Sequence, residues 1–557
     1  MEKNWLKAYP ANVPAEVNVA QYSSLVELME ASFRRNGDKT AYTMMGRSIS
    51  FAQVDAASTA LAAYLQSLGL APGDRVAIML PNLFQYPVAV AAVLRAGYAV
   101  VNVNPLYTPR ELEHQLKDSG AKAIIILENF ASTLEQVLAS VPTKHVLLCA
   151  MGDMLGLAKG AIVNLVVRHV KKMVPPFELP NAVRFNEALA RGRRLTLRAP
   201  KIKADDIAVL QYTGGTTGVS KGAVLLHRNL VANVLQAEAW YQPALKKVPS
   251  GAQVVTICAL PLYHIFGFTA NMMLSMHMGG CNVLIPNPRD IPALFGELSK
   301  HKFHSLPAVN TLFMAMANHA QFNSVDWSNL VISVGGGMAV QQATAKLWLE
   351  KTGCPICEGY GLSETSPVAS CNPTDSSAYT GTIGLPVPNT DMKLLDDDGN
   401  EVAAGAAGEI AIRGPQVMAG YWQRPDETSK VMTADGFFRT GDIGVVDAQG
   451  YFKIVDRKKD MILVSGFNVY PNEIEDVVTQ MPGVLEAGAV GVADPKSGEA
   501  IKLVVVRKDP TLTEAAVRAW CEEQLTGYKR PKLIEFRTEL PKSPIGKILR
   551  RELREKT

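Results

Sequence analysis

The sequence predicts an α/β protein of more than one domain: a large N-terminal region of α/β subdomains, a small β subdomain, and a compact α+β domain at the C-terminal end. Two observations lead to this prediction. Strand-like and helix-like segments alternate between residues 50 and 127, and short strands with turn signals follow between 391 and 456. In addition, 557 residues exceed the length of one ordinary domain.

The first elements alternate in type. A helix is expected from Ser50 to near Gly69, because Ser50 and Gln53 have the spacing of a capping box and a glycine follows the segment. Alternating strand-like and helical stretches then lie at 75–80, up to Leu94, at 98–104, near 109–119 and at 121–127. This alternation indicates a largely parallel sheet.

The sequence changes in character from residue 391 onward. Short strands with turn signals at 391–456 indicate the small β subdomain. A helix start at Pro471, apolar strands at 487–493 and 501–508, and a helix at 513–525 follow. Together they are typical of an α+β domain of about 100 residues, a common size for an autonomous fold.

Composition excludes several classes of protein. Hydrophobic residues make up 48% and charged residues 19%, as in globular proteins and unlike disordered or fibrous ones. A net charge of +4 is too small to indicate a nucleic-acid partner. The seven cysteines have no framework spacing, which favours a reducing compartment, and we interpret Cys354 and Cys357 as packing residues and not as a metal or redox pair.

The chain is expected to be cytoplasmic, because it lacks a signal-peptide pattern and any run of 18 apolar residues. Residues 155–175 are apolar and contain Arg168, Lys171 and Lys172. This segment could lie on an anionic surface, such as the cytoplasmic face of the inner membrane, but we favour an ordinary amphipathic core helix with a solvated basic end. The sequence leaves a homodimer open.

The most distinctive local feature is the segment 212–222, YTGGTTGVSKG, after a strand-like run. Glycines allow close approach of backbone N–H groups, hydroxyls add donors, and Lys221 supplies a cation, so the segment can surround the phosphates of ATP. The residues expected to bind nucleotide are Thr213, Gly214, Gly215, Thr216, Thr217, Gly218 and Lys221. It is not a Walker A loop, since Ser220 precedes and Gly222 follows the lysine; alone, it could also be a flexible turn.

The segment resembles the nucleotide loop of the adenylate-forming (AMP-binding) superfamily of acyl-CoA synthetases, aryl-CoA ligases, luciferases and adenylation domains. Further motifs follow in that family's order: PLYHIFG, GYGLSETSP, GEIAIRG, FRTGD, DRKKDMI, SGFNVYPNEIE and PKSPIGKI. The resemblance implies an N-terminal AMP-binding adenylation domain at 1–456 and a mobile C-terminal AMP-binding enzyme domain at 457–557.

The resemblance assigns residues around ATP. Glu364 is implied to hold Mg²⁺ together with Thr213, as suits a cation that takes one or two carboxylates. Thr365 is implied to contact the α-phosphate and Tyr360 to stack on adenine. Asp442 is implied to bind the ribose hydroxyls, with Arg457 as a second ribose or phosphate contact.

The resemblance also assigns the chemistry. Lys547 matches the catalytic lysine, which neutralises charge on the carboxylate and α-phosphate. Lys459 matches the hinge about which the C-terminal domain rotates between two half-reactions; without the family, 456–460 is a charged linker.

Two substrate sites complete the assignment. Ser465, Gly466 and Phe467 resemble the loop beside the pantetheine channel of coenzyme A. The candidate acyl pocket includes His264, Gly335, Gly336 and Gly337, within a set that also contains Tyr263, Phe266 and Ser363. For His264, a hydrogen-bonded core histidine is the alternative.

The implied function is ATP-dependent ligation of a fatty acid to CoA through an acyl-adenylate, with Mg²⁺ as cofactor and with AMP and pyrophosphate as products. Residues 435–459 resemble bacterial fatty-acyl-CoA synthetases, and the match continues toward the long-chain type of fatty acid β-oxidation. Because one buried methylene is worth about 0.8 kcal/mol, tolerance of medium to long chains is expected. The alternatives are an aryl-CoA ligase of the 4-coumarate type, an assembly-line adenylation module, and a non-catalytic nucleotide-binding regulator.

Overall fold

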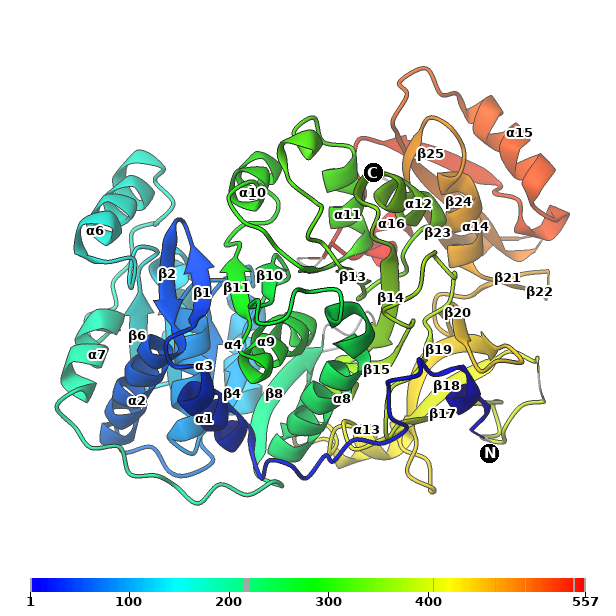
Figure 1. The fold of residues 1–557 in the computed structure, drawn as a ribbon. Coiled ribbons are helices and arrows are strands. Elements are labelled where there is room, and N and C mark those ends of the chain that lie inside the picture. The colour runs from blue at the N-terminus through cyan, green and yellow to red at the C-terminus, as the bar shows by residue number, and fades with distance from the viewer. Residues whose placement is uncertain are drawn as a thin grey trace.

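The computed structural model describes residues 3–213, 220–403, 405–465, 467–495, 497–543 and 546–554, with residues 457 and 468 described by their backbone alone. Within these ranges, the strands form four sheets flanked by helices, as the α/β prediction requires. Figure 1 shows the two larger sheets in the blue and green parts of the chain, and the smaller ones in its yellow and orange parts.

The first large sheet has seven strands, in the order β7-β6-β5-β3-β4-β8-β9. All neighbours are parallel except β8 and β9, which form an antiparallel pair. Its strands are β3 (Arg75–Met79), β4 (Ala99–Asn102), β5 (Ala123–Leu127), β6 (His145–Cys149), β7 (Val183–Arg184), β8 (Ile207–Thr213) and β9 (Lys221–Leu226). The predicted parallel sheet is therefore confirmed, since β3, β4 and β5 occupy the three strand-like runs.

The second large sheet has nine strands, in the order β16-β15-β14-β13-β12-β10-β11-β1-β2. It combines a parallel centre with antiparallel pairs at both edges. Its strands are β1 (Thr40–Met44), β2 (Arg47–Ser50), β10 (Val255–Cys258), β11 (Cys281–Leu284), β12 (Ser305–Ala308), β13 (Ile332–Gly335), β14 (Ile356–Gly361), β15 (Val368–Cys371) and β16 (Leu385–Pro386).

Helices pack between and outside these sheets. The capping boxes at Ser50 and Thr108 start two of them, as local hydrogen bonding predicts. They are α1 (Leu25–Asn36), α2 (Phe51–Ser67), α3 (Gln85–Arg95), α4 (Pro109–Ser119), α5 (Ala131–Leu138), α6 (Leu157–Leu165), α7 (Phe185–Gly192), α8 (His227–Leu245), α9 (Leu274–Met278), α10 (Ile291–Leu298), α11 (Asn310–Ala317) and α12 (Gln342–Thr352). Two short segments are π-helical, η3 (Val166–Val170) and η4 (Gly267–Met273), and η6 (Ser363–Thr365) is a 3₁₀ helix.

A buried row of polar side chains ties the two large sheets together. The Tyr86 hydroxyl donates to Asn102 Oδ1 at 2.6 Å, and the Asn102 amide donates to Gln211 Oε1 at 3.0 Å. Gln211 in turn donates to the Tyr263 carbonyl at 3.2 Å. Because Tyr86, Asn102 and Gln211 are buried, breaking one link would leave another polar group unsatisfied, so the row fixes the Tyr263 loop against β4 and β8.

The β subdomain is a four-stranded antiparallel sheet, which agrees with the turn-rich sequence. Its strands are β17 (Asp391–Leu395), β18 (Gly408–Arg413), β19 (Phe438–Val446) and β20 (Phe452–Arg457), and α13 (Pro425–Val431) lies beside it. Strand β20 leads directly into the last part of the chain.

Residues from Ile462 onward form a separate sheet with its own apolar core. Its strands are β21 (Ile462–Val464), β22 (Phe467–Val469), β23 (Val484–Asp494), β24 (Gly498–Arg507) and β25 (Leu533–Arg537), and its helices are α14 (Pro471–Thr479), α15 (Glu514–Gln524) and α16 (Arg550–Arg554). Figure 1 places this orange and red unit at one end of the molecule, beside α11 and α12.

Helix α6 and the segment η3 direct most of their large apolar side chains toward solvent and not toward the core. Leu157 is 97% exposed and Ile162 64% exposed. The inner side holds Gly160, which packs against Gly152, together with Val163 and the buried Val167. The Gly152 N–H donates to Asn164 Oδ1 at 2.6 Å. The favoured core-helix interpretation of residues 155–175 is therefore wrong, because periodicity reveals an apolar stripe but not the direction in which it points.

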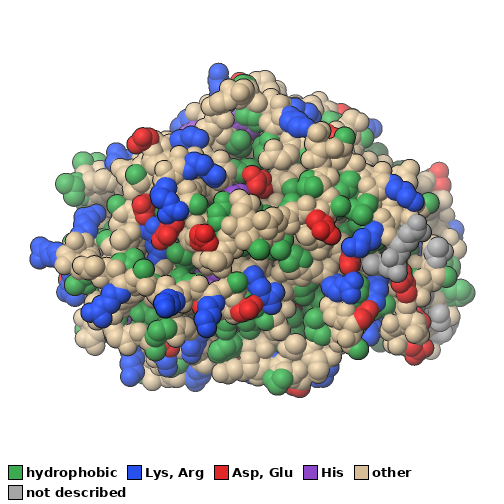
Figure 2. All heavy atoms as spheres, turned by 60° about the horizontal axis from the view of Figure 1, so that its bottom comes forward, with side chains coloured by type: hydrophobic (Ala, Val, Ile, Leu, Met, Phe, Trp, Pro, Cys, Tyr) green, Lys and Arg blue, Asp and Glu red, His purple; other side chains and the backbone are tan. Residues whose placement is uncertain are grey.

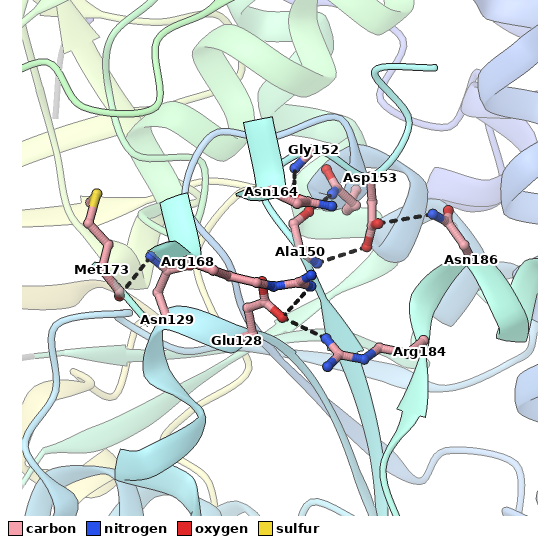
Figure 3. A network of polar contacts seen from close by, with 11 residues as sticks. Glu128, Asn129, Ala150, Gly152, Asp153, Asn164, Arg168, Met173, Arg184 and Asn186 are labelled. Atoms are coloured by element: carbon pink, nitrogen blue, oxygen red, sulfur yellow. Dashed lines mark hydrogen bonds and ion pairs between the residues drawn. The ribbon is translucent and has the colours of Figure 1, made fainter. Parts of the chain in front are cut away.

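Arg168 anchors this helix to the body of the protein (Figure 3). Its guanidinium makes two hydrogen bonds of 2.8 Å with the carboxylate of Glu128, which also accepts one of 2.6 Å from Arg184. Glu128 is 1% exposed, so its charge depends on these two arginines. Arg168 is thus a structural residue, and only Lys171 and Lys172 of the predicted basic cluster face solvent.

Charge is mixed on the surface. Figure 2 shows acidic and basic side chains interspersed across one face of the molecule, in keeping with the small net charge. Among the described helices, none is both long and apolar enough to cross a membrane.

Replacing Glu128 with glutamine should loosen α6 and η3. Loss of the charged hydrogen bonds should cost about 1–3 kcal/mol of local stability, which corresponds to about 5- to 150-fold faster cleavage after Lys171 and Lys172. The measurement is the rate of limited trypsin digestion.

Glu187→Gln is the matched control, because Glu187 pairs with Arg191 on an exposed helix face. Such a pair is worth less than about 1 kcal/mol. Equal cleavage rates for the wild type and Glu128→Gln would contradict the anchoring role of Glu128.

Candidate functional site

The base of the phosphate-loop segment lies at the carboxyl end of a parallel sheet, where α/β folds bind ligands. Strand β8 ends at Thr213 and β9 begins at Lys221. The Ser220 hydroxyl donates to the Thr213 carbonyl at 2.7 Å and so closes this base. The predicted nucleotide contacts Gly214, Gly215, Thr216, Thr217 and Gly218 lie outside the described residues.

Lys221 is held by a carboxylate and an aromatic ring. Its Nζ lies 2.6 Å from Glu427 Oε2 and 4.8 Å from the centre of the Tyr421 ring. Hydrogen bonds from Lys221 and Lys430 lower the pKa of Glu427 to about 2, so this carboxylate is ionised at neutral pH. The lysine is thus directed by its neighbours before any phosphate arrives.

Glu364 lies in η6 beside the same aromatic side chain. The Tyr421 hydroxyl donates to Glu364 Oε1 at 2.7 Å, and the Glu364 carbonyl accepts from Met418 N–H at 2.8 Å. Burial and the adjacent Glu364 carboxylate raise the pKa of Tyr421, so it remains a donor. The next residue, Thr365, is fully buried, and its hydroxyl donates to the Pro367 carbonyl within the same turn.

Tyr360 and Asp442 join two sheets at the site. The hydroxyl of Tyr360, on β14, donates to Asp442 Oδ2, on β19, at 2.6 Å. Asp442 is 3% exposed, and its N–H donates to the Thr440 hydroxyl at 3.1 Å. Its strand neighbour across β19 and β20 is Arg457, whose side chain lies outside the described part of the structure.

The predicted acyl-pocket residues fall into two groups. A Cβ on Gly336 would lie 3.0 Å from the Phe266 ring, so a glycine leaves room for that ring. By contrast, a Cβ on Gly335 would point at the core residues Val340 and Ile356 and not toward Phe266. Gly337 has a φ of +77°, a conformation that favours glycine.

Lys547 approaches this pocket from the other end of the chain. Burial and the nearby positive charge of Lys547 lower the pKa of His264 to about 4, so the imidazole is neutral at physiological pH. A Cβ on Gly546 would lie 2.5 Å from the Thr311 hydroxyl, and Gly546 has a φ of +81°. Close approach and backbone conformation both require glycine there, which explains the residue before the predicted catalytic lysine.

The predicted CoA and hinge residues lie at the edge of the C-terminal unit. Ser465 has a φ of +50°, and its N–H donates to the Ser497 carbonyl at 2.8 Å. Phe467 is 55% exposed and stacks on Tyr528 with ring centres 4.6 Å apart. Gly466 lies outside the described residues, and Lys459 occupies an exposed turn after β20.

Comparison with known proteins supplies the family. The profile described as AMP-binding enzyme matches residues 29–422, and the one described as AMP-binding enzyme C-terminal domain matches residues 473–547. The chain belongs to the AMP-binding enzyme family. These two matches fall on either side of the turn that contains Lys459.

Full-length relatives of this AMP-binding enzyme carry a common name. The chain is 56% identical to a long-chain-fatty-acid–CoA ligase of Escherichia coli and 57% identical to one of Salmonella typhimurium, in each case over all of this chain and 98% of the relative. Among solved structures, an anthranilate CoA ligase in complex with anthranoyl-AMP is similar with a TM-score of 0.84 and 26% identity, over 97% of this chain and 98% of that chain.

Several residues near the site of this AMP-binding enzyme carry no sequence signal. Tyr421 and Glu427 contact the predicted site residues Glu364 and Lys221 but lie in none of the motifs. Glu358, which directly precedes the GYGLSETSP motif, is a third such residue. Burial raises the pKa of Glu358 from 4.5 to about 8, although its Oε1 accepts a hydrogen bond of 3.0 Å from Val340 N–H.

Glu358 should make the stability of the protein depend on pH. Its pKa is raised in the folded state, so the folded protein binds a proton that the unfolded chain has lost between pH 4.5 and pH 8. The contribution of Glu358 to stability should therefore be fully present below pH 4.5 and should fall by about 1.4 kcal/mol per pH unit toward pH 8. Nearby Asp476 strengthens this effect and Lys453 weakens it.

Glu358→Gln tests this dependence, because an amide keeps the shape without titrating. Thermal midpoints of the two proteins should agree near pH 4.5 and diverge toward pH 8, with the variant more stable. A constant difference across this range would show that Glu358 is not the titrating group.

Proposed function

We propose that this protein ligates long-chain or medium-chain fatty acids to coenzyme A at the expense of ATP, through an acyl-adenylate. The full-length relatives named as long-chain-fatty-acid–CoA ligases support the reaction and the acid class. The observation that carries the mechanism is the proximity of Lys547 to His264, because it brings a cation from the C-terminal unit to the candidate acyl pocket. The products are acyl-CoA, AMP and pyrophosphate.

In the first half-reaction, a carboxylate oxygen of the fatty acid attacks the α-phosphorus of ATP and pyrophosphate leaves. The carboxylate and the α-phosphate are both anionic, so the site must offset their negative charge for them to meet. Lys547 neutralises the carboxylate and α-phosphate, while Lys221 and the threonines of the phosphate loop hold the leaving phosphates. Glu427 keeps the Lys221 ammonium in place until the phosphates of ATP replace this carboxylate.

The residues around Glu364 fit a magnesium ion bound with ATP. The donor set offers one carboxylate, from Glu364, and the hydroxyl of Thr213, which suits a cation that keeps waters and takes its other ligands from phosphates. When bound, Mg²⁺ supplies positive charge to the leaving pyrophosphate. The Tyr421 hydroxyl orients the Glu364 carboxylate through its hydrogen bond of 2.7 Å.

The adenosine part of ATP is assigned to the junction of β14 and β19. Asp442 accepts hydrogen bonds from the ribose hydroxyls, and Tyr360 both stacks on adenine and holds this carboxylate. Arg457 adds a ribose or phosphate contact. Thr365 contacts the α-phosphate. To do so, its hydroxyl donates to a phosphate oxygen in place of the Pro367 carbonyl.

In the second half-reaction, the CoA sulfur attacks the acyl carbonyl and AMP leaves. Lys547 must then withdraw, so we assign a rotation about Lys459 to a C-terminal domain at 457–557, with an adenylation domain at 1–456. Ser465, Gly466 and Phe467 border the pantetheine channel. Exposure of the Phe467 ring suits contact with a ligand that arrives from solvent.

The acyl chain is assigned to the pocket of His264, Gly336 and Gly337, with Gly335 keeping strand β13 close to its core neighbours. A neutral His264 avoids a second fixed charge beside an apolar chain. Because each extra buried methylene adds about 0.8 kcal/mol, neighbouring chain lengths should differ by about fourfold in binding.

Lys547→Ala should separate the two half-reactions. Exchange of pyrophosphate into ATP should fall by about 100- to 1000-fold, because a preorganised charge is lost from the transition state. Thioester formation from supplied acyl-AMP and CoA should change by less than about threefold. Equal loss of both steps would contradict the assigned role.

Substrate preference should favour the fatty-acid assignment over the aryl-acid alternative. A panel of fatty acids from short to long, with ATP, Mg²⁺ and CoA, should give a broad profile of AMP release among medium and long chains. Coumarate should compete poorly with palmitate. A sharp optimum at acetate or at an aryl acid would refute the acid class.

We further propose that the protein is cytoplasmic and attaches peripherally to an anionic membrane through the outward face of α6 and η3. This face consists of Leu157, Ile162, Leu165 and Val170, which are 57–97% exposed. Lys171 and Lys172 follow directly and are exposed, so apolar insertion and attraction to anionic lipids act on the same side. A water-insoluble substrate would be met at such a surface.

Replacing Leu157, Ile162 and Leu165 with serine should lower binding to anionic phospholipid vesicles by about tenfold or more, since each apolar side chain contributes up to about 1.5–3 kcal/mol when buried. Leu533→Ser, at an exposed leucine of the C-terminal unit, is the matched control. Co-sedimentation measures the bound fraction.

Two results would count against this surface. Unchanged vesicle binding by the triple variant would exclude membrane contact through α6. A concentration-dependent dimer in the absence of lipid, lost in the same variant, would show that a second copy of the chain covers this face.

A further inference from the structure

Asp456 lies at a boundary between the two units of the chain. It is the next-to-last residue of β20, and the turn with Lys459 follows it. Its side chain is fully buried. A buried carboxylate needs compensating partners, and two of the partners of Asp456 come from beyond this turn.

The first partner is the N-terminus of α14. The N-cap residue of this helix, Tyr470, makes no side-chain capping hydrogen bond. Asp456 caps the helix instead, because its Oδ2 accepts a hydrogen bond from the Asn472 N–H at 2.9 Å. A carboxylate at this position satisfies a backbone donor and interacts favourably with the helix dipole.

The second partner is Arg550, the first residue of α16. Its Nη1 lies 3.1 Å from Asp456 Oδ1. The same guanidinium bonds Glu475 at 2.8 Å and 3.1 Å, and it contacts Asn472. Burial opposes the charge of Arg550, but Glu475 and Asp456 outweigh it and raise the pKa above the usual value, so the arginine stays charged.

Arg550 also connects to the catalytic lysine. It follows Lys547 by three residues, and backbone hydrogen bonds hold that short stretch. Ser543 N–H donates to the Lys547 carbonyl at 2.7 Å, Leu549 N–H donates to the Pro541 carbonyl at 2.8 Å, and Lys542 and Ile548 form an isolated β-bridge. The tight Gly546 turn then meets Thr311. A continuous path therefore runs from Asp456 through Arg550 to the loop that presents Lys547 beside His264.

The partners of Arg550 differ in what a rotation about Lys459 would do to them. Glu475 and Asn472 lie on the same side of the hinge as Arg550 and would move with it. Asp456 lies on the other side, so its bonds to Arg550 and to Asn472 N–H belong to the arrangement seen in this structure.

We propose that Asp456 is a positioning residue that holds the C-terminal domain in the adenylating arrangement, by pairing across the hinge with Arg550 and with the N-terminus of α14. This inference rests on the proposed two-step function and adds to it the interaction that selects the first step. Loss of the pair shifts the population toward other arrangements and leaves the chemistry of the second step intact.

The test compares Asp456→Asn with Glu475→Gln in the full-length protein. Both variants remove a negative charge from the same guanidinium, but only Asp456 lies across the hinge. Asp456→Asn should lower pyrophosphate exchange by about tenfold or more while thioester formation from supplied acyl-AMP changes by less than about threefold. Glu475→Gln should change both steps by the same factor.

A double-mutant cycle with Arg550→Met makes the test specific to the pair. If the interaction acts as inferred, the loss of pyrophosphate exchange in the double variant should be smaller than the product of the two single losses, since the Asp456–Arg550 pair can be removed only once. Arg550→Lys should recover part of the exchange activity, because it retains a charge but not the planar fork. Circular dichroism and thermal midpoints identify any variant that fails to fold.

Several outcomes would overturn the inference. Equal loss of both steps in Asp456→Asn, the same split in Glu475→Gln, or additive effects in the cycle would each show that Asp456 acts only on stability. A wild-type protein that exchanges no pyrophosphate would refute the proposed function itself, whereas an active wild type with an unchanged Asp456→Asn would refute the positioning role alone.

Discussion

The approach of the Lys547 loop to the His264 pocket is the contact on which the proposed mechanism depends. Residues from the middle and from the last part of the chain must meet at one point, and Gly546 permits this because it has no Cβ to strike Thr311. The positive charge of Lys547 helps to lower the pKa of His264, as expected when the lysine approaches the imidazole. Every assigned role in the first half-reaction assumes that the lysine is there.

The rest of the fold supplies fixed positions for that meeting. The seven-stranded sheet carries Thr213 and Lys221, the nine-stranded sheet carries Tyr360 and leads into Glu364, and the β subdomain carries Asp442. Direct hydrogen bonds hold these parts together, from Tyr360 to Asp442 and from Tyr421 to Glu364. A site divided among several sheets can thus be rigid except at the one place where the chain crosses the hinge.

Local sequence signals predicted much of this architecture. The Ser50 capping box, the alternation of strands and helices, and the helix starting at Pro471 are set by neighbouring residues, and the structure has them at or close to the predicted positions. The resemblance to a family located the nucleotide loop, Glu364, Asp442 and Lys547 as candidates. Of these, Glu364 shares the Tyr421 side chain with Lys221 at the base of the loop.

What the sequence could not provide were contacts between residues far apart in the chain. Asp456 and Arg550 are separated by 94 positions, so nothing local marks them as a pair. The outward orientation of α6 follows from Gly160 and Arg168 meeting partners on the body, and periodicity alone does not indicate it. Glu358 acquires its high pKa only from burial beneath the folded chain.

The most direct test of the acyl-adenylate mechanism follows the oxygen of the acid. With a fatty acid labelled with ¹⁸O in the carboxylate, attack of that oxygen on the α-phosphorus places one labelled oxygen in AMP for each thioester formed. Mass spectrometry of AMP and pyrophosphate should therefore find the label in AMP and none in pyrophosphate. Unlabelled AMP, or label in pyrophosphate or phosphate, would contradict the adenylate route.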